Sequence, residues 1–354
     1  MASTGQEGKL QEIPAPDLVW RPPTPDPPAR VGLLGCGSIA ETHLRSYQDA
    51  GVQVVALCSR DQNKARHYAE RFCPQAEIAA DPEQLFARSD LDAVDLTPHA
   101  AVRLPLIEQA LAAGQHVLSQ KPLATDLASA RLLVACAERH GRLLAVNQNG
   151  RWAPHFAWMR QAVLAGHVGQ VTAIRQEVRW DHNWIFGLAF DQDPHVVLED
   201  FGIHWFDFVA SLLPGRTPKR IRASEAHSPG QTARPPLSAT AQLDFEGVQV
   251  SLVFEGNTRE KQTESTLIIG TKGRLESRGA PLDGQELILT TAAGRARAPL
   301  SGRWFPDAFA HSLHELVRAV RDPSASARPL HDARENLRSL EWCFAAVEAA
   351  EGGS

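Results

Sequence analysis

The stretch VGLLGCGSIAETHL, residues 31–44, decides the fold of the first half of the chain. It begins with a short apolar run typical of a buried strand and continues through two glycines into a helical pattern. Glycines between a strand and a helix let backbone N–H groups approach a pyrophosphate, because no Cβ stands in the way. This context favours a dinucleotide site over a tight turn without a ligand, and it predicts cofactor contacts at Gly35, Gly37, Ser38 and Ile39.

The same strand-then-helix alternation continues over residues 30–149. Apolar strand patterns lie at 31–34, 52–58, 93–96, 116–118 and 143–146, and helical patterns lie at 38–49, 61–72, 104–113 and 126–139. Short connections between alternating strands and helices are typical of a doubly wound parallel sheet. We therefore expect an α/β fold that begins with an NAD(P)-binding Rossmann domain at 30–149.

The pattern changes in residues 150–354. Alternating segments at 171–178, 239–245, 248–254, 265–269 and 287–290 indicate strands, and helical patterns lie at 156–165, 198–213, 307–321 and 332–350. Strands that follow one another without helices favour an antiparallel sheet. The second domain is therefore expected to be α+β, with a large, open, mostly antiparallel sheet that serves substrate binding and oligomerisation.

The first 29 residues contain seven prolines and no long apolar run, so we expect residues 1–29 to form a disordered tail. They do not resemble a secretion signal, and no later segment is long enough to cross a membrane. A net charge of −5 gives no basic surface for nucleic acid. The five cysteines are widely spaced, which favours free thiols in a reducing compartment and a cytoplasmic protein.

The end of the second strand should decide between NAD and NADP. An acidic residue there would bind the adenosine ribose and repel a 2′-phosphate. Ser59 and Arg60 stand at this edge, and Asp61 follows. A hydroxyl and a guanidinium suit a phosphate, so NADP is preferred over NAD. In the alternative, Arg60 faces solvent or stacks on adenine while Asp61 reaches the ribose.

The expected helix at 198–213 has a polar stripe. At 3.6 residues per turn Asp200, His204, Asp207 and Ser211 fall on one line, and large apolar residues cover most of the rest. Because buried ionisable groups are costly without partners, the stripe should face a cavity or a charge. A helix cap with satisfied polar groups is the alternative. A metal site at His195, Glu199 and His204 lacks the usual ligand spacing, so no metal is expected.

A lysine ends the strand within GQHVLSQKPLA, residues 114–124. If Lys121 meets the polar stripe beside a nicotinamide, the three groups can oxidise a secondary alcohol. His204 would accept the hydroxyl proton and Lys121 would stabilise the developing alkoxide, while Asp200 would orient one of them. Lys121, Asp200 and His204 are the predicted catalytic residues.

The chain resembles the glucose-fructose oxidoreductase / inositol dehydrogenase / rhizopine-catabolism (Gfo/Idh/MocA) family over residues 30–351. Motifs that are similar to the family's occur in the family's order: VGLLGCGSIAETHL, GQHVLSQKPLA, NQNGRWAP, LEDFGIHWFDF, LIIGTKGRLE and the terminal helices. The resemblance implies that Lys121, Asp200 and His204 are catalytic. It also implies a homodimer or homotetramer formed through the C-terminal sheet.

Two departures from the family pattern affect the cofactor side of the site. Gln120 stands where the family usually has a glutamate that contacts the nicotinamide ribose. Thr97 and Pro98 resemble the family's Thr-Pro loop, but its customary histidine is replaced by Val102 or Arg103. The resemblance still implies cofactor contacts from Thr97, Pro98, Gln120 and Lys121.

Five of the eight tryptophans lie between residues 152 and 205, and aromatic faces stack on the C–H faces of sugars. Trp180, His182 and Trp184 are therefore predicted substrate contacts beside Lys121, Asp200 and His204. Arg151 either binds substrate or pairs across the domain crossover.

The sequence thus predicts an NAD(P)-dependent oxidoreductase acting on a secondary alcohol or ketone of a sugar, polyol or sugar-like compound. Two alternatives remain. The first is NAD-dependent glycoside cleavage by transient oxidation and elimination. The second is a non-catalytic cofactor-binding sensor or assembly subunit.

Overall fold

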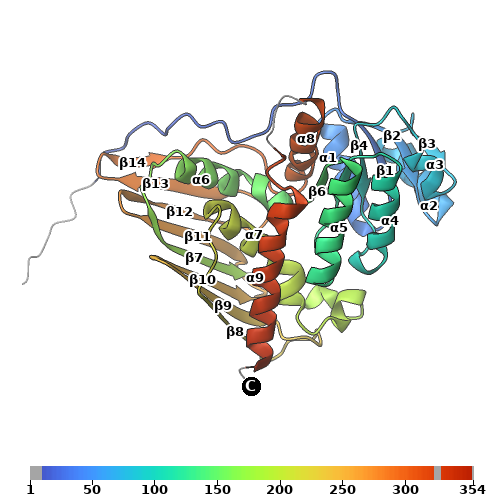
Figure 1. Cartoon of the computed structure of the whole chain (residues 1–354). Coiled ribbons are helices and arrows are strands. Elements are labelled where there is room, and N and C mark those ends of the chain that lie inside the picture. The colour runs from blue at the N-terminus through green and yellow to red at the C-terminus, as the bar shows by residue number, and fades with distance from the viewer. Residues whose placement is uncertain (1–9, 323–327, 353–354) are drawn as a thin grey trace, which may run out of the picture.

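A computed structural model describes residues 10–322 and 328–352, and its first sheet is the expected Rossmann sheet (Figure 1). The six strands pair in parallel in the order β3-β2-β1-β4-β5-β6. Their bounds are β1 Arg30–Leu34, β2 Gln53–Cys58, β3 Glu77–Ala79, β4 Ala93–Leu96, β5 Val117–Ser119 and β6 Leu144–Val146. The order reverses between β1 and β4, which is where open α/β sheets bind ligands.

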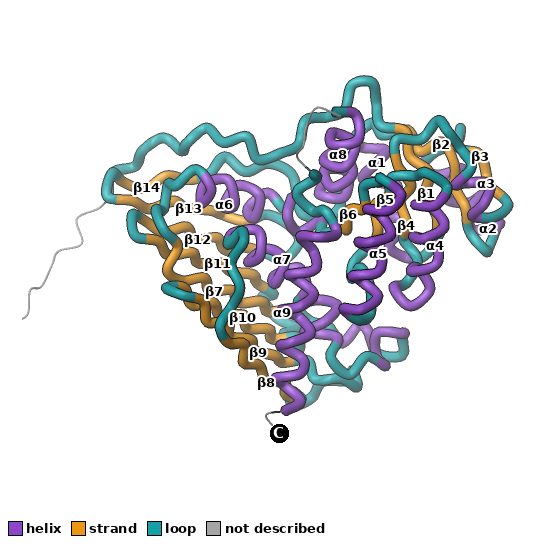
Figure 2. The backbone as a smooth tube through the Cα atoms, viewed as in Figure 1, coloured by secondary structure: helices purple, strands orange, loops and turns teal. Residues whose placement is uncertain are grey.

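Helices cover both faces of this sheet (Figure 2). They are α1 Ser38–Asp49, α2 Gln62–Phe72, α3 Pro82–Phe86, α4 Ala100–Ala112 and α5 Leu127–His140, and α8 Asp307–Arg321 joins them from the end of the chain. The side chain of Ser46 on α1 accepts a hydrogen bond from the Ala310 backbone N–H of α8 at 3.0 Å. The C-terminal part of the chain thereby completes one layer of the Rossmann half.

The second sheet has eight strands in the order β14-β13-β12-β11-β7-β10-β9-β8. Only β7 and β10 pair in parallel, so the expectation of a mostly antiparallel sheet is confirmed. The bounds are β7 Val171–Arg179, β8 Arg220–Ala226, β9 Ser238–Phe245, β10 Val248–Glu255, β11 Thr263–Gly270, β12 Gly273–Gly279, β13 Gln285–Thr291 and β14 Gly294–Arg297.

Helices cover only one face of the second sheet, and the other face is open (Figure 2). The covering helices are α6 Pro154–Leu164, α7 Ile203–Leu212 and α9 Ala333–Gly352. The inward side chains of the strands, such as Ile174 and Ile268, are fully buried under these helices. This one-sided burial explains the period-two pattern in the sequence. Strands β3, β8, β12 and β14 are not among the predicted strand segments, since they are short or carry few apolar residues.

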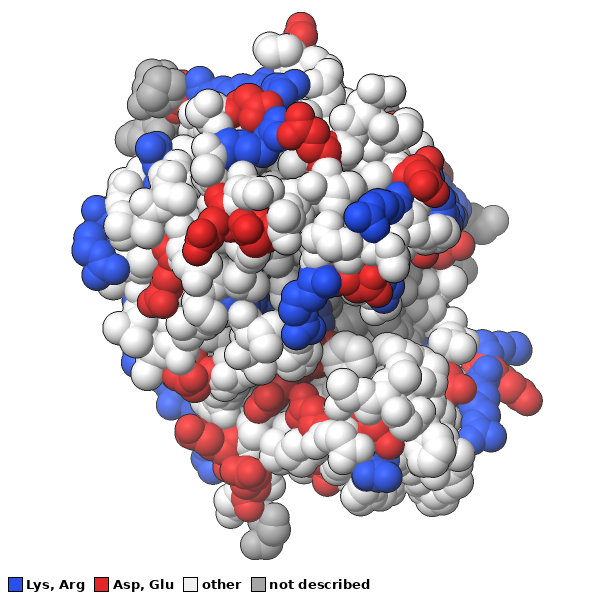
Figure 3. Space-filling model, turned by 90° about the vertical axis from the view of Figure 1, so that its right-hand side faces the viewer, with Lys and Arg blue, Asp and Glu red and all other residues white. Residues whose placement is uncertain are grey.

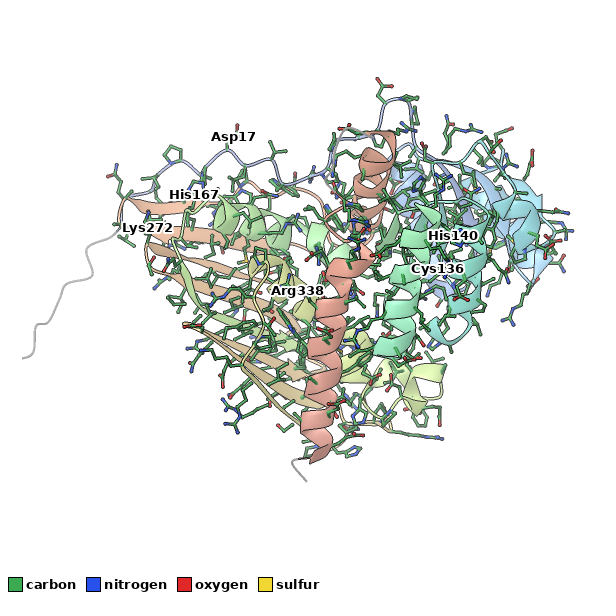
Figure 4. All side chains as sticks on the ribbon, viewed as in Figure 1. Asp17, Cys136, His140, His167, Lys272 and Arg338 are labelled. Carbon is green, nitrogen blue, oxygen red and sulfur yellow. The ribbon has the colours of Figure 1, made fainter. Side chains whose placement is uncertain are left out.

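Arg338 on α9 holds the end of α7, and Figure 4 shows it between the sheet and the Rossmann half. Its guanidinium donates to the carbonyls of Ala210 and Leu213, the latter at 2.7 Å. The last carbonyls of a helix lack intrahelical partners, so a cation at this end satisfies them. The helix that carries His204 is therefore anchored at its far end.

For residues 10–29 the expectation of a disordered tail is wrong, while residues 1–9 lie outside the described chain. The backbone of Ile13 donates to Arg295 of β14 at 2.9 Å, which extends the sheet edge. The segment then runs over α6 toward β1, with Asp17 pointing outward (Figures 1 and 4). Leu18 and Trp20 pack against the main core. A few well-spaced apolar side chains and an unpaired sheet edge outweigh the proline-rich composition.

Candidate functional site

The turn after β1 has the geometry of a dinucleotide cradle. Gly35 has φ +103°, and a Cβ there would stand 2.6 Å from the Thr97 hydroxyl, so no other residue fits. That hydroxyl donates to the Gly35 carbonyl at 2.8 Å and braces the turn. Gly37 caps α1, and a Cβ at this position would meet no atom within 4 Å. The N-terminus of α1, with Ser38 and Ile39, is thus open to an anion, and these residues fit a pyrophosphate.

The residues that were predicted to choose between NAD and NADP lie at the end of β2. The Asp61 carboxylate accepts hydrogen bonds from the N–H groups of Asn63 and Lys64, both at 3.1 Å. It therefore caps α2 through Oδ1, which accepts both hydrogen bonds. Ser59 is half-buried and Arg60 is exposed at the same edge.

Lys121 and Asp200 meet across the two halves of the chain. The Lys121 ammonium donates to the Asp200 carboxylate at 2.9 Å and to its backbone carbonyl at 2.6 Å. The side chains are 14% and 16% exposed, so the pair is sheltered but reachable from solvent. Lys121 follows β5 and Gln120, whose side-chain oxygen accepts from the Lys121 N–H at 2.9 Å. The carboxyl edge of the Rossmann sheet thus delivers the lysine as the sequence predicts.

Asp200 lies in a π-helical turn, η4 Val197–Phe201, directly before α7. The Gly202 N–H donates to the Val197 carbonyl five residues earlier at 2.8 Å. A Cβ on Gly202 would stand 2.6 Å from the Leu198 carbonyl, which is why the sequence has glycine here. Such turns add one residue to a helix and are frequent at functional sites. The extra residue changes the register between Asp200 and α7.

His204 stands in the first turn of α7 beside this ion pair. Burial, followed by the nearby positive charge of Lys121, holds the pKa of His204 well below its usual range. Its Nδ1 is buried and finds no hydrogen-bond partner among the described residues. A Cβ on Gly150 would stand 3.0 Å from the Trp304 ring and 3.4 Å from this nitrogen, so the glycine leaves room for Trp304 beside the imidazole. The imidazole is therefore neutral and has an unused nitrogen.

The polar stripe divides into two parts, and Asp207 does not face the site. It forms a bidentate pair with Arg151, with Nε–Oδ2 and Nη2–Oδ1 distances of 2.6 and 2.9 Å. Ser339 adds a hydrogen bond to the same carboxylate at 2.8 Å. The Arg151 and Asp207 side chains are 6% and 1% exposed. The Arg151 guanidinium is therefore buried and engaged, which favours the pairing alternative for Arg151 over a substrate contact.

Ser211, the last residue of the predicted stripe, also turns away from the site. Its hydroxyl donates to the Phe208 carbonyl at 2.6 Å within the same helix. Only Asp200 and His204 of the four stripe residues lie beside Lys121.

The loop after β7 places the three predicted substrate residues at different depths. Trp184, in the short helix η2 Asn183–Ile185, is 55% exposed. Trp180 is half-buried and packs edge-on against Trp205 at 5.8 Å. His182 is only 5% exposed and stacks on Phe201, with ring centroids 4.1 Å apart, and a substrate contact at His182 stays a prediction. The His182 imidazole thus packs against the ring of Phe201, the residue after Asp200.

The alternative metal set does not assemble. The His195 imidazole forms ion pairs with two carboxylates. Its Nδ1 lies 2.6 Å from Glu225 Oε2, and its Nε2 lies 3.2 Å from Glu351 Oε1. Within residues 10–322 and 328–352 no three His, Cys, Asp or Glu side chains are arranged to hold a metal. Burial and then the charge of Asp193 raise the pKa of Glu199 to about 7. The sequence does not predict this pKa shift, because it depends on burial and on the carboxylate of Asp193 in the folded chain.

The residues in place of the family's customary histidine take different positions. Val102 is 49% exposed on the outside of α4, and Arg103 is 1% exposed beneath the site. The Arg103 guanidinium donates to the carbonyls of Pro98 and Pro122. Sequence reasoning gave Arg103 no role, although a guanidinium one turn into a buried helix is itself an unusual signal.

The comparison with family models covers both halves of the chain. Residues 29–148 match the model of the oxidoreductase family with an NAD-binding Rossmann fold. Residues 156–276 match the Gfo/Idh/MocA C-terminal domain.

Several curated relatives are named as enzymes of sugars or polyols, and one is named a trans-1,2-dihydrobenzene-1,2-diol dehydrogenase. A dTDP-3,4-didehydro-2,6-dideoxy-α-D-glucose 3-reductase of Saccharopolyspora spinosa is 34% identical over 259 residues, 70% of this chain and 74% of the relative. A D-apiose dehydrogenase of Paraburkholderia graminis is 31% identical over 198 residues, 55% of this chain and 52% of the relative. The chain spans about half the length of several curated relatives that it matches, with shares of 52%, 43% and 59%.

Solved structures share the fold over almost the whole chain. An oxidoreductase of Agrobacterium radiobacter, in complex with NAD+, L-tartaric acid and magnesium, has a TM-score of 0.79 and 22% identity. The match covers 92% of this chain and 97% of that one. With both halves matched and a relative 34% identical over most of its length, the chain belongs to the Gfo/Idh/MocA oxidoreductase family.

Proposed function

We propose that this protein is an NAD(P)-dependent oxidoreductase acting on a secondary alcohol or ketone of a sugar, polyol or sugar-like compound. The observation that carries the proposal is the Lys121–Asp200 pair with neutral His204 beside it, at the carboxyl edge of the Rossmann sheet. The names of the curated relatives, which include dehydrogenases and reductases of sugars and polyols, support the substrate class.

Each of the three side chains has a separate task in the oxidation. His204 accepts the hydroxyl proton of the substrate, because its imidazole is neutral at physiological pH. Lys121 donates a hydrogen bond to the same oxygen and stabilises the charge that develops on it. Asp200 holds the ammonium through its carboxylate and its carbonyl. A bound nicotinamide supplies the hydride acceptor for oxidation and the hydride donor for reduction.

The residues fit a dinucleotide along the edge of the sheet. Gly35, Gly37, Ser38 and Ile39 would hold the pyrophosphate. The contacts that would flank the nicotinamide are Thr97, Pro98, Gln120 and Lys121. NADP is the preferred cofactor, because Asp61 is engaged as a cap while Ser59 and Arg60 remain at the edge.

Trp180 and Trp184 would contact the sugar beside Lys121, Asp200 and His204. This loop lies beside the site, since the ring centroids of Trp184 and Phe201 are 6.0 Å apart and Phe201 is the neighbour of Asp200. Aromatic faces at this position suit the C–H faces of a ring substrate.

A second copy of the chain is the proposed partner. The open face of the C-terminal sheet forms a hollow that arginine, glutamate and apolar side chains line. A homodimer or homotetramer would cover this face. Figure 3 looks onto the Rossmann end of the molecule and shows positive and negative side chains interspersed on that face.

None of the helices in the described chain is both long and apolar enough to span a bilayer. Together with five cysteines that form no disulfide in the structure, this supports the proposal of a cytoplasmic enzyme.

The test is a screen for NAD(P)-linked turnover, followed by absorbance at 340 nm. Polyols and aldoses are offered with NAD+ and NADP+, and keto sugars are offered with NADH and NADPH. We expect turnover with at least one polyol or sugar. Released aglycone from a glycoside without net cofactor reduction would favour oxidation and elimination. Cofactor binding without turnover across the panel would favour a sensor.

A further inference from the structure

Arg103 is a buried cation that joins the ends of two Rossmann strands. It lies in the first turn of α4 and is 1% exposed, among the largest fully buried side chains of the described chain. One guanidinium nitrogen donates to the Pro98 carbonyl after β4, and the other donates to the Pro122 carbonyl after β5. These two strands are neighbours, with Val94 paired to Val117.

Both carbonyls belong to loops of the candidate site. Pro98 follows Thr97, whose hydroxyl braces the turn at Gly35. Pro122 follows Lys121, so its position determines where the ammonium stands relative to Asp200. A guanidinium is a rigid planar fork, and donating to two carbonyls sets the spacing of the groups that carry them. Arg103 therefore links the dinucleotide turn to the lysine loop.

Simple packing does not account for a charge at this position. In the described chain Arg103 forms no ion pair, and its Nε has no hydrogen-bond acceptor. Burial lowers the pKa of Arg103 to about 9, and the charges of Asp200 and Asp95 oppose this shift. A buried cation without a carboxylate partner is costly, and an apolar side chain would fill the space at lower cost. The charge lies within electrostatic range of Asp200, the partner of Lys121.

We propose that Arg103 is a positioning residue that holds Lys121 at the reacting oxygen by tying the Lys121–Pro122 loop to the Thr97–Pro98 loop. The kinetic part of this inference rests on the proposed function, whereas the structural part concerns Lys121 alone. Arg103 itself is too deeply buried to touch substrate or cofactor.

Arg160 provides a matched control within the same chain. It is 3% exposed, donates to the Arg151 carbonyl at 3.0 Å and leaves its Nε without an acceptor in the described residues. Burial also lowers its pKa, to about 10. It lies in α6 and its charged neighbours are Arg151, Asp207 and Glu315, so it has no link to the lysine loop. Replacing it removes the same group from the same kind of environment.

The test observes Lys121 directly. The chain has six lysines, so reductive methylation with ¹³C-formaldehyde gives few dimethylamine signals, and loss of one in Lys121→Met assigns the site. The variants are Arg103→Met, Arg103→Lys and Arg160→Met, each as the full-length chain. We expect the Lys121 signal to move or broaden in Arg103→Met and to stay in place in Arg160→Met. Arg103→Lys keeps the charge but reaches one carbonyl at a time. The Lys121 signal of this variant should therefore lie between its positions in the wild type and in Arg103→Met.

Kinetics on the same proteins add a second readout. In Arg103→Met kcat should fall about 100-fold, because displacing a catalytic group by about 1 Å has an effect of this size. Cofactor affinity should stay within about threefold, since Thr97 braces the Gly35 turn without Arg103. Arg103→Lys should recover most of the lost kcat, and Arg160→Met should keep the wild-type value.

Different results would overturn the two proposals. An unmoved Lys121 signal in folded Arg103→Met, or an equal shift in Arg160→Met, would show that Arg103 only fills space. If Arg103→Met does not fold, an unmoved signal and full kcat in Arg103→Lys would have the same meaning. A wild-type protein without NAD(P)-linked turnover, but with the expected signals, would contradict the proposed function and leave the positioning role standing.

Discussion

Two ion pairs, one with an aspartate of η4 and one with an aspartate of α7, differ in their exposure to solvent. Lys121–Asp200 joins the two halves of the chain, and its side chains are 14% and 16% exposed. Arg151–Asp207 is 6% and 1% exposed and has a further hydrogen bond from Ser339. A pair that solvent and substrate can reach is available for chemistry, whereas a buried bidentate pair stabilises the fold. We therefore expect the aspartate of η4 to serve the reaction and the aspartate of α7 to stabilise the fold, and the exposure of the two pairs distinguishes them.

The largest expected effect is the loss of turnover in Lys121→Met. The variant removes the ammonium that stabilises the alkoxide, and we expect NAD(P)-linked turnover to fall at least 1,000-fold, or about 4 kcal/mol of barrier. Cofactor affinity, measured by fluorescence titration, should remain nearly unchanged. Turnover at the wild-type rate in this variant would contradict the mechanism.

Arg151→Met should act on stability instead. The variant leaves the Asp207 carboxylate buried without its cation, which costs about 3–5 kcal/mol of unfolding free energy. Urea or thermal unfolding monitored by circular dichroism measures this loss. Arg179→Met is the control, because that pair is exposed, with side-chain fractions of 45% and 41%. Equal stabilities of the two variants would show that the buried pair contributes no more than an exposed one.

Acid should destabilise the protein through its buried histidines. Burial lowers the pKa of six of them: His116, His182, His204, His311, His314 and His331. Between pH 6.5 and about 4 the unfolded chain binds more protons than the folded one, so unfolding free energy falls as pH falls through this range. For His182, with a pKa near 4, the loss is about 3 kcal/mol at most.

Thermal unfolding at a series of pH values measures this dependence. His182→Asn should show a shallower slope of stability against pH, whatever its absolute stability. A thermal unfolding midpoint that stays constant between pH 7 and pH 4.5 would show that the buried histidines do not destabilise the protein in acid.

The smallest effect concerns the cofactor edge. Arg60→Ala should weaken NADPH binding about tenfold, about 1.4 kcal/mol, and leave NADH binding within about twofold, because only NADPH has the 2′-phosphate. Titration of both cofactors into the variant and the wild type gives the comparison. Equal weakening of NADPH and NADH binding would mean that Arg60 does not bind the 2′-phosphate.

Much of the fold follows from sequence patterns. Helix α8 was expected with the bounds that the structure shows, and β4 as well, because their apolar periods are strong and long-range contacts agree with them. The dinucleotide turn and Lys121 were also predictable, since their chemistry depends on local residue types at the end of a strand.

The errors share a physical cause, which is dependence on distant contacts. A constant 3.6-residue period placed four polar residues on one line, but the π turn at Val197–Phe201 and the partner Arg151 divide them. The N-terminal segment has the composition of a tail and is ordered by the edge of β14. The role of Arg103 depends on two carbonyls from different loops, which no local pattern reveals.

The most direct test of the comparison is a crossed measurement on Asp200→Asn and Asp207→Asn. For each variant the unfolding free energy and the NAD(P)-linked turnover per folded molecule are determined together. We predict that Asp200→Asn loses turnover and keeps its stability within about 1 kcal/mol, whereas Asp207→Asn loses several kcal/mol of stability and keeps its turnover. If Asp200→Asn retained full turnover, or if both variants lost stability alike, the division between a working pair and a structural pair would be wrong.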